Sequence, residues 1–269
     1  MRSQQFGLSI QTVTNLVQFC NVCLRKNIRV QLLPTFFRHC LVKATCGDCH
    51  VCCIECVVDL VYVVDSSGSI NHKDPRNWDI TKEFLVSVTR LFTIGPDDVQ
   101  VGFVLFSEVA TVEWGLTRYQ DQASLINAIE NVHYIAETTN LNDALYLART
   151  QVLAPGNGTR PGASLAVVIV TDGEDNVPVE GTPLTLQNAT ALKQAGVQIV
   201  AIGVSDQVDE ARLREIVTAP ADTHYYAVDD FQALMSVAAR LRPTVCLTQA
   251  PTTSKTSHSI PQTIIATGY

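Results

Sequence analysis

The sequence predicts an α/β domain with a doubly wound, mostly parallel sheet, one antiparallel edge strand and helices on both faces. From Asp59 onward, short runs rich in β-branched residues alternate with amphipathic helical patterns. The runs 59–64 and 165–170 are almost entirely apolar, as expected of strands buried on both faces of a parallel sheet. The run 109–114 follows the run 99–106 after a short turn and is therefore expected to pair with it in antiparallel orientation.

The first half of the predicted domain begins with a strand that ends at Asp65. A helix is expected from Asp74-Pro75, because an acidic N-cap followed by proline in the first turn favours a helix start. Its apolar stripe contains Trp78, Phe84, Leu85, Val88 and Leu91. The elements that follow are a turn at 95–98, the strands 99–106 and 109–114, and a short helix from Asp121.

The second half begins with a polar loop at 136–140, which leads into a helix with Leu141, Ala144, Leu145 and Ala148 on one side. A Pro- and Gly-rich loop at 155–162 then precedes the most apolar strand. The remaining elements are, in order, the strand 165–170, a helix from about Pro183 to a C-cap at Gly196, the strand 197–204, a helix at 209–217, the strand 224–228 and a final helix capped by Asp229-Asp230.

Size and charge restrict the class of protein. The chain has 269 residues, of which 46% are hydrophobic and 17% charged, enough for one full-sized domain with flanking segments. A net charge of −7 argues against nucleic acid or an anionic membrane surface as the main partner. No apolar run approaches the ~20 residues that span a bilayer. The run 8–17 is interrupted by polar residues, so no signal peptide is evident.

Cysteines concentrate before the predicted domain, where eight of the nine lie in residues 1–56. Two Cys-x-x-Cys steps, at 20–23 and 46–49, roughly resemble a four-cysteine zinc pattern, whereas disulfides are expected in a secreted protein. Both alternatives stay open, as does an incomplete N-terminus. We expect residues 1–56 to be a poorly structured segment, 57–245 to be the α/β domain, and the Ser-, Thr- and Pro-rich residues 246–269 to be a disordered tail.

Oxygen-bearing side chains follow several of the predicted strands. Asp65, Ser67 and Ser69 come directly after the first strand, Thr139 lies in the 136–140 loop, and Asp172 follows the strand 165–170. Because the carboxyl ends of parallel strands share one edge of a sheet, these loops can converge. Such ligands suit Mg²⁺, Mn²⁺ or Ca²⁺ and do not select zinc or copper. The alternative is an ordinary strand-to-helix turn, since turns use the same residues.

These motifs resemble the von Willebrand factor A domain, which is found in integrins, matrilins and collagens. The Asp-x-Ser-x-Ser pattern of residues 65–69 is similar to the family's metal-ion-dependent adhesion site (MIDAS). Thr139-Asn140 and Thr171-Asp172-Gly173 resemble its second and third loops, and the likeness covers residues 57–245. The resemblance implies that Asp65, Ser67, Ser69, Thr139 and Asp172 hold a divalent cation directly or through water.

The resemblance has further implications and one departure. Matrix-type members often have a glycine pair where this chain has Ala136-Glu137, and Glu137 could tighten cation binding or compete with a ligand carboxylate. In many secreted members a cysteine pair joins the ends of the domain, here Cys56 and Cys246, although Cys246 could instead be free. Asn157 and Asn188 begin glycosylation sequons, of which Asn157, in a loop, is the better acceptor.

The predicted function is therefore a secreted, cation-dependent adhesion module and not an enzyme. It would use Mg²⁺, or Mn²⁺ or Ca²⁺, to recruit an acidic side chain of an extracellular-matrix partner such as a collagen. One alternative is a structural matrix domain that self-associates without using the ion. Another is a metal-dependent hydrolase in which Glu137 or Glu174 activates a metal-bound water, although the six histidines form no His-x-x-x-His pair.

Overall fold

The structure is a computed structural model that describes residues 56–173 and 182–246. Within these residues, six strands form one sheet in the order β3-β2-β1-β4-β5-β6. Only β3 runs antiparallel to its neighbour, and it lies at the sheet edge, so the predicted fold class is confirmed. The strands are β1 (Val58–Asp65), β2 (Val99–Phe106), β3 (Ala110–Trp114), β4 (Ser164–Thr171), β5 (Val197–Val204) and β6 (Tyr225–Val228).

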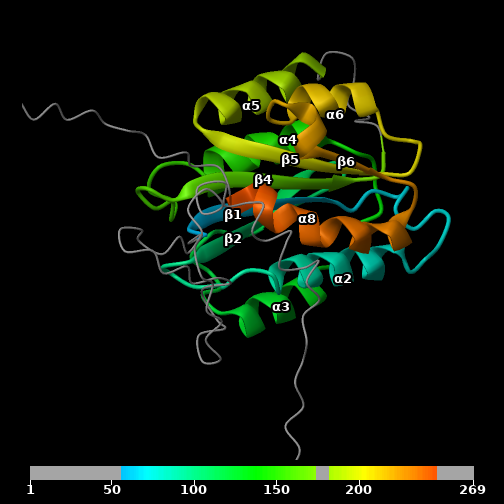
Figure 1. Cartoon of the computed structure of the whole chain (residues 1–269). Helices are drawn as coiled ribbons and strands as arrows, with labels where there is room; N and C mark the ends of the chain where they lie inside the picture. The colour runs from blue at the N-terminus through cyan, green and yellow to red at the C-terminus, as the bar shows by residue number, and fades with distance from the viewer. Residues whose placement is uncertain (1–55, 174–181, 247–269) are drawn as a thin grey trace, which may run out of the picture. The chain divides into compact units, whose positions relative to one another are not determined.

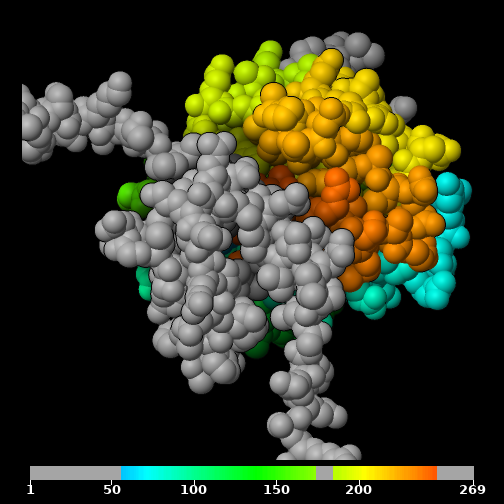
Figure 2. All heavy atoms as spheres, in the orientation of Figure 1, coloured from blue at the N-terminus to red at the C-terminus, as the bar shows by residue number. Residues whose placement is uncertain are grey.

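Helices cover both faces of the sheet (Figure 1). One face carries α2 (Asn77–Thr89), α3 (Gln122–Glu130) and α8 (Met235–Cys246), and the other carries α4 (Leu141–Leu147), α5 (Thr182–Gln194) and α6 (Glu210–Ile216). A π-helical segment, η2 (Ala148–Val152), extends α4. In the same orientation, the space-filling view shows the C-terminal part of the domain, coloured yellow to orange, facing the viewer (Figure 2).

The central strand β1 is buried along its whole length, because it lies between β2 and β4 in the sheet and between helices on both faces. Its register aligns the carboxyl ends of its neighbours. Asp65 pairs with Phe106 of β2, and Val64 pairs with Val170 of β4. The segments that follow β1, β2 and β4 therefore emerge side by side at one edge of the sheet.

Two helix boundaries differ from the prediction. The first helix begins at Asn77 and not at Asp74, because Asp74-Pro75 forms a turn in which the Asp74 carboxylate accepts hydrogen bonds from the backbone and guanidinium of Arg76. The same helix ends at Thr89, so Leu91 lies beyond it and is 37% exposed. Leu91 is thus not part of the buried stripe.

The C-terminal region also differs in detail. A short helix, α7 (Ala221–His224), precedes β6, so that strand begins at Tyr225 and not at His224. The predicted final helix is divided into a 3₁₀ turn, η4 (Phe231–Leu234), and α8. Asp230 caps this region as predicted, since its carboxylate accepts a hydrogen bond from the backbone N–H of Ala233.

Predictions for residues 1–55, 174–181 and 247–269 lie outside the described residues. They include the Cys-x-x-Cys steps, the disordered tail and Glu174.

One buried ion pair fixes the amino-terminal edge of the sheet. The Asp59 carboxylate is fully buried in β1 and accepts hydrogen bonds from the backbone N–H and the Nε of Arg160, at 2.7 and 2.8 Å. The same guanidinium donates to the carbonyls of Val58, Pro96 and Asp98. A single side chain thereby ties the 155–162 loop to β1 and to the turn before β2.

We expect Arg160→Ala to lower the free energy of unfolding by about 3–5 kcal/mol, because it leaves a buried carboxylate without its partner. The measurement is urea denaturation of the variant and the wild type. Arg76→Ala is the matched control, since it removes an exposed ion pair with Asp74 and should change stability by less than about 1 kcal/mol. Equal effects of the two substitutions would contradict the role given to Arg160.

Candidate metal-ion site

The carboxylate of Asp65 is held at the end of β1 by two neighbouring groups. Its Oδ1 accepts a hydrogen bond from the backbone N–H of Ser67 at 2.8 Å, and its Oδ2 accepts one from the Thr171 hydroxyl at 2.6 Å. The first bond is formed within the tight turn after β1, and the second comes from the last residue of β4. Asp65 is 1% exposed, so this carboxylate is both buried and fixed in orientation.

The third oxygen-bearing loop joins this turn directly. The hydroxyls of Ser67 and Ser69 lie 3.0 Å apart, and the Ser69 hydroxyl donates to Asp172 Oδ1 at 2.7 Å. Asp65, Ser67, Ser69 and Asp172 are thus linked at one place, although Asp172 is 103 residues after Ser69 in the chain. The structure brings these four residues together as the sequence predicts.

Thr139 reaches the same edge without joining that chain of hydrogen bonds. A Cβ atom built on Gly173 would lie 3.6 Å from the Ser69 hydroxyl and 3.7 Å from the Thr139 hydroxyl, so the two hydroxyls border the same space. Thr139 is buried. Among the described residues, no hydrogen bond joins the Thr139 hydroxyl to the side chains of the other four predicted metal ligands.

The loop before Thr139 is fastened to the turn after β1. The backbone N–H of Gly68 donates to the Glu137 carbonyl, and that of Ala136 donates to the Ser66 carbonyl, both at 2.8 Å. The Tyr134 hydroxyl donates to the Ser67 carbonyl at 2.7 Å. Ala136 has a φ of +69°, in the left-handed region that favours glycine. This residue lies where the sequence departs from a glycine pair.

Burial and mutual repulsion make the two carboxylates difficult to ionise. Desolvation raises the pKa of Asp65, and its hydrogen bonds oppose this shift only in part. Burial is the largest cause of the raised pKa of Asp172, which is about 7. The negative charge of Asp65 adds to this shift, while the hydrogen bond from Ser69 and the positive charge of Lys73 oppose it. Across residues 56–173 and 182–246, neither carboxylate forms an ion pair with Lys, Arg or His.

This set of donors fits a hard divalent cation. Two carboxylates and three hydroxyls supply only oxygen. A cation would compensate the charge of the two carboxylates, with which no described Lys, Arg or His side chain forms an ion pair. Within the described residues, no group of three or more His, Cys, Asp and Glu residues could hold a metal ion. A metal site built on Asp65 and Asp172 would therefore need hydroxyl ligands in addition to these two carboxylates.

Sequence reasoning included Thr171 in the third loop without its supporting role, and it missed Tyr134 and Ser107 altogether. Thr171 orients Asp65, Tyr134 holds the turn, and Ser107 bonds both the N–H of Glu137 and the carbonyl of Thr138. The only available signal was position, since Thr171 adjoins Asp172 and Ser107 directly follows β2. Asn140, next to Thr139, is a cap that accepts a hydrogen bond from the N–H of Asp143 at the start of α4.

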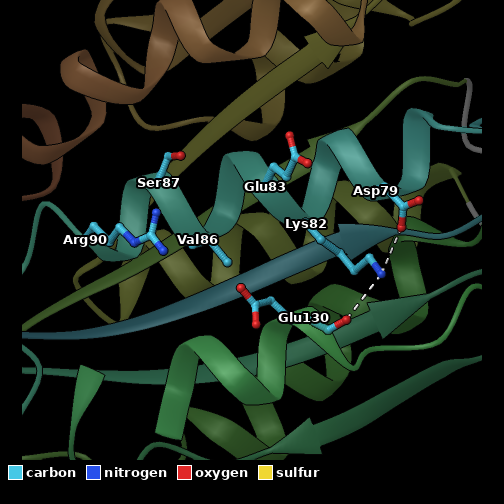
Figure 3. A pocket seen from close by; sticks show the side chains of 7 residues that line it. All are labelled: Asp79, Lys82, Glu83, Val86, Ser87, Arg90 and Glu130. Carbon is cyan, nitrogen blue, oxygen red and sulfur yellow. Dashed lines mark hydrogen bonds and ion pairs between the residues drawn. The ribbon is translucent and has the colours of Figure 1, made fainter. Parts of the chain in front are cut away.

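A groove of about 530 Å³ lies apart from this cluster, along α2 and α3 (Figure 3). Lys82 crosses it, bonding the Asp79 carboxylate and the Glu130 carbonyl. None of the five oxygen-donor residues lines it. The lining residues are Asp79, Lys82, Glu83, Val86, Ser87, Arg90 and Glu130.

The other predicted site residues have the following environments. Cys56 and Cys246 are each disulfide-bonded, and their pairing with one another stays a prediction. Asn157 is exposed and donates to the Gln151 carbonyl at 2.8 Å. Asn188 is half-buried on α5, and its amide bonds Arg149 and Asn142. Glycosylation of either asparagine also stays a prediction.

Comparisons with known proteins give a consistent result. The family model of the von Willebrand factor type A domain matches residues 59–240. The human collagen alpha-1(XX) chain is 36% identical over 188 residues, which are 70% of this chain and 14% of the collagen. Mouse matrilin-1 is 27% identical over 207 residues, which are 77% of this chain and 39% of matrilin-1.

Among solved structures, proximal thread matrix protein 1 from the mussel byssus, with a zinc-occupied MIDAS motif, is 28% identical with a TM-score of 0.63. That match covers 72% of this chain and 46% of the mussel protein. The chain thus spans less than half the length of each of these relatives. The zinc is a property of the mussel protein, and the identity of the divalent cation in this chain stays a prediction.

We expect Ala136→Gly to raise the free energy of unfolding by about 0.5–1 kcal/mol, because glycine adopts a positive φ without the steric cost of a Cβ atom. Guanidinium denaturation measures the change. Ala123→Gly, at an exposed position within α3, is the matched control and should be destabilising by about 1 kcal/mol. A loss of stability in both variants would show that Ala136 is not strained.

The raised pKa of Asp172 predicts how stability depends on pH in the presence of a chelator. The folded protein binds this proton more tightly than the unfolded chain, whose aspartate pKa is about 3.9. The stabilising contribution is therefore complete below about pH 4 and is lost as the pH rises through about 7. Thermal unfolding of the wild type and Asp172→Asn from pH 4 to 8 tests this, and the variant should lack that component of the pH dependence. An unchanged pH profile in the variant would contradict it.

Proposed function

The chain belongs to the von Willebrand factor type A domain family, and on this premise we propose that it is a divalent-cation-dependent protein-binding module of adhesive function. One observation supports this most strongly. Buried Asp65 and Asp172 lie in one hydrogen-bonded cluster with Ser67 and Ser69, and no described cationic side chain forms an ion pair with either carboxylate.

In this proposal Asp65, Ser67, Ser69, Thr139 and Asp172 hold the ion, directly or through water. A bound cation would supply an electrophilic position for a carboxylate of the partner. Ser67, Ser69 and Thr139 are neutral ligands, so they leave the charge of the ion undiminished. Asp65 is oriented in advance by Thr171 and the turn, which reduces the rearrangement needed on binding.

The proposed cation is Mg²⁺, or Mn²⁺ or Ca²⁺, and the mussel relative adds Zn²⁺ to the cations to be tested. The proposed partner is an extracellular-matrix protein such as a collagen, and the proposed location is the extracellular matrix. Similarity to a collagen chain and to matrilin-1 supports both. None of the described helices is long and apolar enough to cross a membrane. We propose no catalytic role for the chain.

The test is surface plasmon resonance against immobilised collagens and other matrix proteins, with each cation and with a chelator. We expect binding that requires a divalent cation and that Asp65→Ala abolishes, because the substitution removes a buried charged ligand. Asp97→Ala, which removes an exposed carboxylate before β2, is the control and should bind like the wild type. Binding that persists with chelator and in Asp65→Ala would reject a metal-bridged mechanism.

A further inference from the structure

The turn that carries Ser67 and Ser69 is closed by a single oxygen atom, the hydroxyl of Tyr134. This hydroxyl donates a hydrogen bond to the Ser67 carbonyl at 2.7 Å and accepts one from the backbone N–H of Asn71 at 3.3 Å. Ser69 lies midway between these two residues, and its own carbonyl accepts a hydrogen bond from the N–H of His72 at 3.0 Å. The backbone on each side of Ser69 is therefore bonded to the same side chain.

Tyr134 is itself fixed by Trp78, a buried residue in the first turn of α2. The centroids of the two aromatic rings lie 5.6 Å apart, and the Trp78 indole N–H donates to the carbonyl of Val132, two residues before Tyr134, at 3.3 Å. The backbone N–H of Trp78 donates to the side-chain oxygen of Asn71 at 2.9 Å, which ties the far end of the turn to the same helix. The position of the Tyr134 hydroxyl is therefore set from the core of the domain.

We propose that Tyr134 is a positioning residue for the cation, which it influences through Ser67 and Ser69 without contacting the ion. This inference rests on the proposed function, because it concerns the geometry of the same ligands. The proton of the Tyr134 hydroxyl and one of its lone pairs are used on the backbone of the turn. Backbone that is fixed in this way determines where the two serine hydroxyls point, as outer partners of a metal site orient its ligands.

The spacing of the two serine hydroxyls connects this role to the size of the ion. Mg²⁺ requires a nearly ideal octahedron of oxygens at about 2.0–2.1 Å, in which neighbouring oxygens are about 2.9 Å apart. The hydroxyls of Ser67 and Ser69 lie 3.0 Å apart, which matches that spacing. Ca²⁺ binds oxygen at about 2.3–2.6 Å and accepts irregular shells, so it depends less on a fixed spacing. Closure of the turn by Tyr134 should therefore matter more for Mg²⁺ than for Ca²⁺.

The main experiment is calorimetric titration of the full chain with Mg²⁺ and, separately, with Ca²⁺. Tyr134→Phe removes the hydroxyl and keeps the ring that contacts Trp78. We expect this variant to bind Mg²⁺ about tenfold more weakly than the wild type. Its affinity for Ca²⁺ should fall by less than about threefold, because Ca²⁺ tolerates irregular ligand geometry.

Tyr226→Phe is the matched control. Tyr226 is a buried residue of the edge strand β6, and its hydroxyl also has two hydrogen-bond partners, the Thr223 carbonyl and the Thr244 hydroxyl. This variant should lose stability for the same reason as Tyr134→Phe, since each loses a tyrosine hydroxyl with two partners. Its affinities for Mg²⁺ and Ca²⁺ should equal those of the wild type, because its hydroxyl makes no contact with the turn.

Amide hydrogen exchange in the presence of a chelator gives a second measurement that does not depend on the ion. In Tyr134→Phe the Asn71 N–H loses its acceptor, so the amides of residues 67–72 should exchange roughly fivefold faster than in the wild type. In Tyr226→Phe the exchange of these amides should be unchanged, even where the amides of β1 exchange faster because the whole domain is less stable.

The outcomes separate this inference from the proposed function. A wild-type chain that binds neither cation would overturn the proposed function, and the role of Tyr134 with it. Wild-type binding that Tyr134→Phe leaves unchanged, or weakens equally for Mg²⁺ and Ca²⁺, would overturn the positioning role and leave the proposed function intact. Unchanged exchange of residues 67–72 in Tyr134→Phe would also overturn the positioning role.

Discussion

The site depends on one constraint, which is that two carboxylates are buried close together at the end of the central strand. Asp65 and Asp172 are joined through Ser69 and Thr171 and repel one another in a poorly solvated place. Hydroxyl and amide donors orient these groups and reduce the cost of their charge, but they do not neutralise it. A divalent cation would remove both the repulsion and the unsatisfied charge, so the protein arrangement and the proposed ligand are complementary.

The position of this pair follows from the topology of the sheet. β1 lies in the middle, and its register with β2 and β4 brings three strand ends to one level. Loops from both sides can therefore bond to the turn after β1. Thr171 and Asp172 approach it from β4, while Ser107 and the 134–139 loop approach it from the side of β2. A substitution in either neighbouring loop acts on the site through that turn.

Most of the fold could be predicted from sequence because apolar periodicity and turn residues are local signals. The convergence of Asp65, Ser67, Ser69 and Asp172 could be predicted as well, since parallel strands place their ends together. The supporting contacts of Tyr134 and Ser107 could not, because they bond backbone atoms and leave no pattern in residue type. The helix start at Asp74 was wrong because Asp-Pro begins turns as readily as helices, and here the carboxylate bonds Arg76.

The same edge carries most of the unfavourable local features described here. Ala136 has a left-handed backbone, and Asp65 and Asp172 are buried carboxylates with raised pKa values. A folded protein retains such features when a ligand compensates for them or when function requires them. A cation that binds only the folded state would stabilise that state. Once the cation concentration exceeds the dissociation constant, the gain in free energy rises with the logarithm of the ratio of the two. Folding of the domain and binding of a cation at its proposed site are therefore thermodynamically linked. A substitution at Asp65 or Asp172 should change both the free energy of unfolding and the affinity for the cation.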